Sequence, residues 1–410
     1  MSFALRVLIG LVAGFLLGLA IAGSSPAAAA TTVGILAPVG TIFVNLIRMT
    51  VIPLVMSMLV ASVGAMTSSG GLGRTGVRAA LIAFGLLGTA AVGSVLIAEP
   101  ILAHVSIDQA AALALRGPET AVSSSNSTPA GTPTLAQWFV DLVPQNVMKA
   151  TADGAMLPVI LFAVLFGLAL ARVSDAKRGA VLRVVEGIAE AMQRLVVWIL
   201  GLAPIGVFAL AVPLAARLGL SAAGAVVAYV ALVVALTVVA VALLLYPLGI
   251  LAGPMSASAF VSYCAPSQAI GFASRSSLAA LPAMVESAEH AGLSPGASRF
   301  VLPFAMSVFH FGTAVAQTVG VLFLARLFGV TLTASQLASV VFAVVLASFA
   351  VPGIPGGSIV AMVPVLAAAN LPIEGVGILL AVDTIPDMFR TTANLTGAMT
   401  LAAVLPAKQD

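Results

Sequence analysis

Five polar side chains interrupt an apolar stretch near the C-terminus, residues 375–405: Asp383, Asp387, Arg390, Thr391 and Asn394. On a helix, which turns about 100° per residue, all five point into one arc of about 100°. If that helix spans a membrane, each mid-membrane charge costs at least about 2.5–3.5 kcal/mol on insertion scales. Three charges on one stripe cannot persist against lipid, so we expect them to face a cavity inside the protein.

These groups suit a solute with two carboxylates and one ammonium group. The Asp387 carboxylate can hold an ammonium ion, and the planar guanidinium of Arg390 can bind a carboxylate through two parallel hydrogen bonds. The Asn394 amide can donate to a second carboxylate. The structural alternative is an ion pair between Asp387 and Arg390, which are helical neighbours three residues apart. Because that pair alone leaves Asp383 and Asn394 unexplained, the sequence favours a site for an acidic amino acid.

The composition indicates that membrane-spanning helices position this site. Of 410 residues, 61% are hydrophobic and 8% are charged, whereas soluble domains average about 45–50% apolar and about 25% charged residues. A soluble multidomain enzyme and a disordered chain are therefore excluded. A net charge of +3 without a basic cluster disfavours nucleic-acid binding. The single Cys264 excludes an internal disulfide. We expect an all-α polytopic membrane protein.

Apolar runs along the chain are long enough for helices that cross a bilayer, at about 20 residues each. They fall at about 7–23, 33–65, 79–104, 135–171, 184–213, 219–250, 255–294, 298–325, 333–373 and 375–405. The positive-inside rule favours an even number of crossings with both termini in the cytoplasm, because cations such as Arg6, Arg178 and Lys408 then share one side. Ser106–Thr134 is expected to be an external loop.

The N-terminus has a second interpretation. Residues 1–30 combine Arg6, an apolar run and small residues after Ser25, which is the pattern of a secretory signal with a cleavage site. The rest of the chain supplies its own spans, and the first helix balances the topology. We therefore expect this segment to be retained as the first crossing.

Two of the apolar runs are broken at their centres. Run 255–294 contains Ser274-Arg275-Ser276-Ser277, and run 333–373 contains Pro352-Gly353-Ile354-Pro355-Gly356-Gly357-Ser358. Proline and glycine do not continue a helix, and each break has about half a span of apolar residues on either side. Irregular backbone at membrane depth is tolerated only where protein or a cavity surrounds it. We expect two re-entrant hairpins rather than external loops, the second with a tip that acts as a lid.

The order of these features resembles the dicarboxylate/amino acid:cation symporter family, the glutamate transporter homologues. Units 255–328 and 333–405 each consist of a broken hairpin and a long helix, and such repeats are typical of transporters. The resemblance covers almost the whole chain. Its motifs are Arg48–Leu54, Val143–Asn146, Glu190–Met192 with Ala203–Phe208, the serine-rich tip, Gly353–Gly356, and Asp387–Thr391 with Asn394.

The resemblance implies a complete architecture. It implies eight transmembrane helices and two re-entrant hairpins, built as inverted repeats and assembled as a homotrimer in the bacterial inner membrane. Transport would follow an elevator motion through the lipid bilayer. The scaffold would comprise residues 1–70 (helices 1 and 2) and 116–215 (helices 4 and 5). The transport domain would comprise residues 71–115 (helix 3) and 216–410 (helix 6, hairpin 1, helix 7, hairpin 2, helix 8).

The resemblance also assigns roles to single residues. Asp387 would bind the substrate amino group, Arg390 its side-chain carboxylate, and Thr391 and Asn394 its main-chain groups. Ser276, Ser277, Thr313 and Gly353 would complete the substrate site, and Arg275, Pro352, Pro355 and Gly356 would form the gate. Relatives for plain dicarboxylates tend to lack the aspartate at position 387, and relatives for neutral amino acids lack the arginine at position 390. The chain keeps both, so aspartate or glutamate is favoured over a C4-dicarboxylate, which is the alternative.

The chain departs from the family where relatives hold sodium. The family has Asn-Met-Asp-Gly-Thr where this chain has Phe309-His310-Phe311-Gly312-Thr313. Where the family has a carboxylate late in its last helix, this chain has Ala398, and where the family has a Thr-Ser pair in its third helix, this chain has Leu86 and Leu87. Sodium is a hard cation that needs several oxygen ligands, which these apolar side chains do not provide. Two of the three sodium sites are expected to be absent. The third relies on backbone carbonyls near Val351. We expect sodium-independent transport, with no metal and no cofactor.

Several possibilities remain for what replaces sodium. His310 titrates near neutral pH in its unperturbed form, and Asp383 is a second candidate proton site because burial favours a neutral carboxyl group. Alternatively, His310 is packed between Phe309 and Phe311 with its ring nitrogens bonded to backbone. The two phenyl rings could also fill the vacated ion sites and permit exchange, or leave a mainly conductive protein. An enzyme is not expected, because the chain has three histidines and no HExxH motif.

Overall fold

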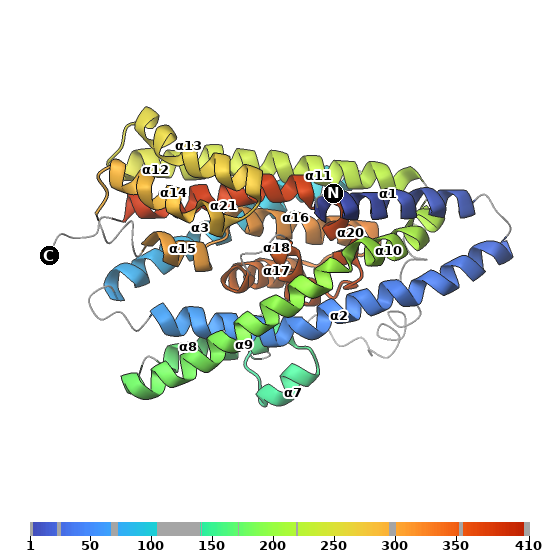
Figure 1. Cartoon of the computed structure of the whole chain (residues 1–410), viewed down its shortest axis with the longest axis horizontal. Coiled ribbons are helices and arrows are strands. Elements are labelled where there is room, and N and C mark those ends of the chain that lie inside the picture. Colours follow the sequence, from blue (N-terminus) through green and yellow to red (C-terminus); the bar gives the residue numbers. More distant parts are fainter. Residues whose placement is uncertain are drawn as a thin grey trace.

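The computed structural model describes residues 3–22, 26–66, 73–104, 140, 142–170, 172–218, 220–294, 301–351 and 356–405. Within these ranges the regular structure is helical and no strand occurs, which confirms the all-α class. Most of the helices run along the long axis of the molecule (Figure 1). The expected external loop at Ser106–Thr134 lies outside the described residues, as do Pro352, Gly353 and Pro355.

Several helices have the length and composition of membrane spans. Among the described residues, five qualify: Leu5–Ala22, Thr31–Gly64, Val77–Ala103, Gly224–Ala252 and Leu302–Leu327. A sixth is added if Asp175–Gly201 and Ala203–Ala216, which meet at an angle of 57°, count as one bent span. These helices support a polytopic membrane protein, and the eight crossings expected from the resemblance stay a prediction.

Two of the apolar runs fold differently from the single helices that their length suggests. Run 184–213 is divided at Leu202 between α9 (Asp175–Gly201) and α10 (Ala203–Leu218). Glycine and proline flank that point, and proline at the start of α10 costs no helical hydrogen bond. The described part of run 135–171 forms α7 (Val147–Ala152) and α8 (Met156–Leu170), separated by a turn at Gly154 with a φ of 68°.

A first group of helices packs around α2 (Pro26–Met66), which lies beside α8, α9 and α10 (Figure 1). The short helix α1 (Phe3–Ala22) runs along α10. Gly10, Gly14 and Gly18 recur every fourth residue on the contacting face of α1. A methyl group on Gly14 would lie 2.5 Å from the carbonyl oxygen of Phe208. The glycines thus permit the backbones of α1 and α10 to approach closely, as small residues do between membrane helices.

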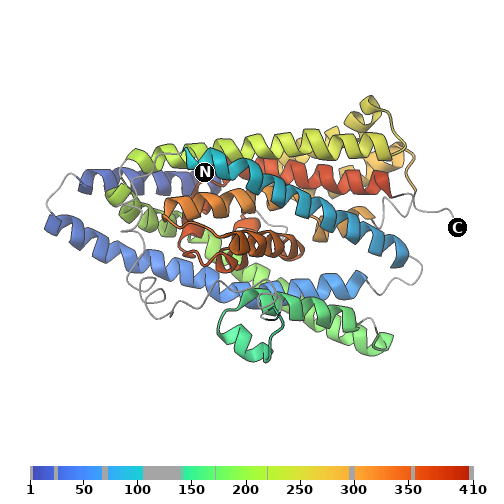
Figure 2. The ribbon, with the colours of Figure 1, turned by 180° about the vertical axis from the view of Figure 1, so that it is seen from behind.

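A second group packs around α16 (Phe311–Leu327), in which every residue except Arg326 is buried. Its neighbours are α3 (Gly73–Ala103), α11 (Leu220–Ala240), α17 (Ala334–Ala347) and α21 (Thr384–Val404). Figure 2 shows α3 lying across α16. A helix that is buried on all faces belongs in the interior of a bundle. The polar groups Asp387, Arg390 and Asn394 of the neighbouring α21 are buried as well.

Both broken runs form helical hairpins. In hairpin 1, α13 (Ala257–Ser274) ends at Arg275 in the left-handed conformation, and α14 (Ser277–His290) begins after Ser276. In hairpin 2, α17 continues as a 3₁₀ turn (Ser348–Ala350) and packs against α19 (Val363–Ala368), which follows the short α18 (Gly357–Val360). The helical hairpins are confirmed, whereas their depth in a membrane stays a prediction.

The long helices that accompany the hairpins are also interrupted. Phe309 and His310 separate α15 (Leu302–Val308) from α16, and Asp383 separates α20 (Gly375–Val382) from α21. At Asp383 the backbone hydrogen bonds continue, since its N–H donates to Leu380 and its carbonyl oxygen accepts from Asp387. At the break before α16, the His310 N–H leaves its helix and donates to Oγ of Ser348 at 3.0 Å.

Candidate functional site

A small polar pocket lies where the hairpin tips meet α21 and the break before α16. The residues that line it are Arg275 and Ser277 of hairpin 1, Val351 and Ser358 of hairpin 2, His310 and Thr313 at the break, and Asp387, Arg390, Thr391 and Asn394 of α21. Its volume is about 30 Å³, which holds one or two water molecules. In this conformation the pocket is too small for an amino acid or a dicarboxylate.

Most of the residues predicted from the sequence gather in this pocket, with a few exceptions. Ser276, Asp383 and Gly356 do not line it. Gly353, Pro352 and Pro355 are outside the described residues. Ser358 was not among the predicted site residues. Its position directly after the glycines of the hairpin 2 break is the signal that could have identified it.

Arg390 is the centre of a buried charge cluster. Its Nη1 and Nη2 atoms donate to the two carboxylate oxygens of Asp383 at 2.8 and 2.9 Å, and Nη2 also donates to Oδ1 of Asp387 at 2.7 Å. All three side chains are almost fully buried. The structural ion pair between Asp387 and Arg390 is therefore present, and Asp383 extends it to a triad. Paired in this way, Asp383 serves to orient Arg390.

The second carboxylate oxygen of Asp387 has a different environment. Oδ2 is buried and has no hydrogen-bond partner among the described residues, while the residue lines the pocket. A buried acceptor without a donor is costly and rare in folded proteins. Oδ2 thus marks a position where a bound solute with an N–H or O–H donor would be stabilised.

Asn394 joins α21 to the start of α16. Its Oδ1 accepts hydrogen bonds from the backbone N–H groups of Gly312 at 2.8 Å and Thr313 at 3.2 Å, and its Nδ2 donates to Oγ1 of Thr313 at 3.3 Å. The amide caps N–H groups that the first turn of a helix leaves unsatisfied. One N–H of the Asn394 amide is left for a bound solute, as the expected donation to a carboxylate requires.

The tip of hairpin 1 divides its serines between two tasks. The Ser276 hydroxyl accepts from the backbone N–H of Ala279 at 3.4 Å and so caps α14, whereas Ser277 lines the pocket. Arg275 has a φ of 54°, which is uncommon outside glycine and marks a strained position. Arg275 lines the pocket together with Asp387.

His310 connects the helix break to hairpin 2. Its backbone N–H donates to Oγ of Ser348 at 3.0 Å, and its ring Nδ1 is 2.8 Å from the Ser348 carbonyl oxygen. The side chain is 3% exposed and lines the pocket. The ring is thus bonded to backbone through one nitrogen, as the structural alternative expected, and it also belongs to the pocket.

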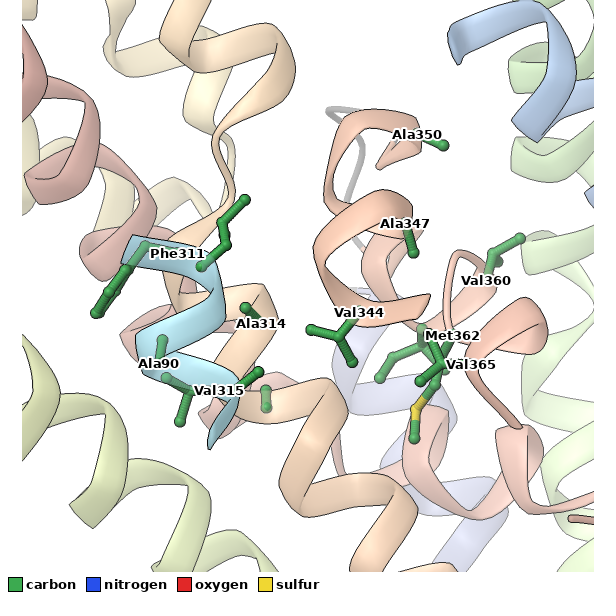
Figure 3. Packing of buried hydrophobic residues seen from close by; sticks show 14 of the residues in the cluster. Ala90, Phe311, Ala314, Val315, Val344, Ala347, Ala350, Val360, Met362 and Val365 are labelled. Atoms are coloured by element: carbon green, nitrogen blue, oxygen red, sulfur yellow. The ribbon is translucent and has the colours of Figure 1, made fainter. Parts of the chain in front are cut away.

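Apolar packing surrounds the break on the side away from the pocket. Phe309 and Phe311 are buried with their ring centroids 6.2 Å apart, and Figure 3 shows Phe311 beside the segment of α3 that bears Ala90. A methyl group on Gly397 would lie 2.8 Å from the Phe309 ring. Ala398 and Leu87 are fully buried and Leu86 is half-buried. These side chains offer no oxygen to a hard cation.

Comparisons with known proteins extend over the whole length of the chain. The sodium:dicarboxylate symporter family matches residues 3–407. A proton/glutamate-aspartate symporter of Escherichia coli (strain K12) is 31% identical over 415 residues, covering 100% of this chain and 93% of that protein. A proton/sodium-glutamate symport protein of Bacillus subtilis (strain 168) is 31% identical over 418 residues, with coverage of 100% and 93%. A C4-dicarboxylate transport protein of Laribacter hongkongensis (strain HLHK9) is 26% identical over 413 residues, with coverage of 100% and 90%.

Proposed function

The chain belongs to the sodium:dicarboxylate symporter family, and from this premise we propose that it is a secondary transporter of acidic amino acids. The family name and the names of the relatives describe transporters rather than enzymes. Those names include both glutamate-aspartate and C4-dicarboxylate as substrates. The choice between the two classes therefore rests on the side chains of the pocket.

The choice between the two substrate classes depends on the Asp387 oxygen Oδ2, which has no partner in the described part of the chain. Oδ2 is a buried acceptor without a partner among the described residues, and an ammonium group is a strong donor to a carboxylate. A C4-dicarboxylate has no such donor and would place its own negative charge beside that oxygen. Aspartate or glutamate offers the ammonium group together with two carboxylates for the guanidinium groups. A C4-dicarboxylate is the second candidate.

Binding would exchange contacts within the charge cluster. The substrate side-chain carboxylate takes a place on Arg390 as Asp387 turns toward the substrate ammonium group. Asp383 keeps its two hydrogen bonds and holds the guanidinium plane in position. Because the closed pocket admits only one or two water molecules, the tip of hairpin 2 acts as a lid that opens before binding and closes behind the substrate.

The two groups of packed helices support an elevator motion. We assign α1, α2 and α8–α10 to the scaffold, which spans residues 1–70 and 116–215. The transport domain spans residues 71–115 and 216–410 and consists of α3 and α11–α21. The scaffold exposes large apolar side chains such as Trp198, which is 73% exposed. Such a face suits lipid or the scaffolds of partner subunits in a homotrimer. Both termini are placed in the cytoplasm of a bacterial cell.

We propose that transport does not require sodium. The side chains at the positions of the family's sodium ligands are phenyl, methyl and isobutyl groups. Phe309, Phe311 and Ala398 are buried, and the two phenyl rings contact each other. Among the described residues no group of three His, Cys, Asp or Glu residues could hold a metal ion. Exchange without ion coupling and a mainly conductive protein are the alternatives, and substrate-saturable counterflow distinguishes the transporter from a channel.

A titration of the purified protein tests substrate class and sodium linkage together. L-aspartate, L-glutamate and succinate are compared by calorimetry and by thermal shift, each with sodium and with choline as the cation. A ligand that binds only the folded state stabilises it by RT ln(1 + L/Kd), where L is the ligand concentration, so the melting temperature rises with the ratio of ligand concentration to Kd. We expect a shift with aspartate or glutamate that is equal in both salts. Binding of succinate alone, or binding only with sodium, would contradict the proposal.

A further inference from the structure

We propose that His310 is the group that takes up a proton when the anionic substrate binds. This inference rests on the proposed function, because it requires an acidic amino acid in the pocket. His310 lines the pocket together with Asp387, Arg390 and Arg275. Among the described residues that line the pocket it is the one whose unperturbed titration falls near neutral pH.

The hydrogen bond at Nδ1 fixes the role of the other ring nitrogen. A carbonyl oxygen can only accept, so the 2.8 Å contact with Ser348 places the proton of the neutral ring on Nδ1. Nε2 then presents a lone pair, which is repelled by a carboxylate oxygen. A proton on Nε2 converts it into a charged donor without disturbing the Nδ1 bond. His310 can therefore change from repelling a carboxylate to binding one while its ring stays in place.

The charge balance of the pocket gives the reason for that proton. In their ordinary charged forms, Arg275 and Arg390 contribute two positive charges, and Asp383 and Asp387 contribute two negative charges. The empty pocket is therefore neutral, and aspartate or glutamate adds one uncompensated negative charge. An unpaired charge is strongly disfavoured in an enclosed site. A proton on His310 compensates the added negative charge and restores neutrality. The negative charge of the bound substrate in turn stabilises the imidazolium form of His310.

The same residue links the proton to hairpin 2. Among the described residues of hairpin 2, His310 makes polar contacts to Ser348, one through its backbone N–H and one through its ring. Ser348 starts the 3₁₀ turn that leads into the tip of hairpin 2. A protonated ring strengthens its hydrogen bond to the carbonyl oxygen, since charged donors form stronger bonds. Proton uptake thus strengthens the contact between the break before α16 and the described part of hairpin 2.

Proton uptake on binding tests this inference in the intact protein. The purified protein is titrated with L-aspartate or L-glutamate in weakly buffered, sodium-free solution, and the pH change is recorded with an indicator dye. We expect about one proton taken up per substrate bound, with an affinity that falls about tenfold for each unit of rising pH. Substrate binding without proton uptake would overturn the inference and leave the proposed function intact. The proposed function itself fails if no acidic amino acid binds.

Two substitutions separate proton binding from the structural hydrogen bond. The amide of His310→Asn can still donate to Ser348 but takes up no proton, so we expect binding that is independent of pH with no proton uptake. His104→Asn is the matched control, because the exposed ring of His104 also contacts a backbone carbonyl, that of Pro100, at 2.7 Å outside the pocket. Unchanged proton uptake in His310→Asn would overturn the inference.

A spectroscopic measurement keeps His310 in place and so does not depend on how a variant at that position folds. The chain has three histidines, and the double variant His104→Asn/His290→Asn leaves His310 as the sole one. With ¹³C- and ¹⁵N-labelled imidazole, its chemical shifts report the protonation state directly. At a fixed pH near neutrality we expect more protonated His310 with substrate than without. A ring that stays neutral in the substrate-bound protein would overturn the inference.

Discussion

The polar wall formed by α21 and the aromatic wall behind the pocket are built from opposite kinds of side chain. Near the start of α21, Arg390 is hydrogen-bonded to Asp383 and Asp387, and one carboxylate oxygen of Asp387 has no partner among the described residues. At the break before α16, Phe309 and Phe311 lie against Gly397, and His310 lines the pocket. Under the proposed function, substrate recognition and cation handling reside on separate elements. The residues for cation handling can therefore change in a chain that keeps the residues for substrate recognition.

Removal of the guanidinium at the centre of the charge cluster is expected to have the largest effect. Arg390→Ala leaves Asp383 and Asp387 buried without their partner, which costs about 3–5 kcal/mol for a broken buried pair. Thermal unfolding should show a marked fall in melting temperature, and calorimetry should show no binding of acidic amino acids. Arg194→Ala is the control, since that side chain is 75% exposed in a 3.8 Å ion pair on α9. A variant at Arg390 that binds aspartate as the native protein does would refute the role of the cluster.

A smaller change at the same wall tests the ammonium contact. Asp387→Asn keeps the shape of the side chain and removes its charge, and a charged hydrogen bond is worth about 1.5–3 kcal/mol. We expect affinity for aspartate and glutamate to fall about 10- to 100-fold, while affinity for succinate falls less or rises. The ratio of the dissociation constants, measured by calorimetry, is the readout. An equal loss for all three ligands would show that Asp387 does not contact an ammonium group.

The aromatic wall is tested by a single added methyl group. Gly397→Ala would bring a methyl group within 2.8 Å of the Phe309 ring, and such overpacking costs about 1–3 kcal/mol. We expect a lower melting temperature with little change in the ratio of aspartate to succinate affinity. Gly187→Ala on α9 meets no atom within 4 Å and serves as the matched control. Equal stability of the two variants would contradict tight packing of the rings.

The two serines of the hairpin 1 tip should give the smallest and most selective effects. Ser276→Ala removes a helix cap, worth about 1 kcal/mol, and is expected to lower the melting temperature without a large change in affinity. Ser277→Ala removes a pocket hydroxyl and should weaken substrate binding with little change in stability. Parallel measurements of melting temperature and dissociation constant check the pair. The reverse pattern would mean that Ser276 contacts the substrate, as the family resemblance implied.

Sequence patterns predicted the polar face of α21 and the two hairpins, because both features depend on residues that are close together in the chain. The polar face of α21 follows from the spacing of Asp383, Asp387, Arg390, Thr391 and Asn394. Both hairpins follow from serine, glycine and proline at the centres of apolar runs. These signals depend on backbone preference and on transfer free energy, which do not require a partner segment to be known.

The choice of partner within the site could not be read from the sequence. Asp383 binds Arg390 about two helical turns further on, Asn394 accepts from Gly312, which lies 82 residues earlier, and His310 bonds to Ser348 across 38 residues. Each contact depends on how separate helices are placed in three dimensions. The division at Leu202 was missed for a related reason, since glycine and proline within an apolar run permit a bend without requiring one.

Uptake of radiolabelled L-aspartate by proteoliposomes tests the central claim most directly. Vesicles preloaded with unlabelled aspartate are placed in labelled aspartate, in parallel solutions that contain sodium or choline. Because the groups that bind substrate lie on α21 and the family's sodium ligands are replaced at the aromatic wall, we predict saturable exchange at the same rate in both solutions. Exchange that occurs with sodium and is abolished without it would contradict the account.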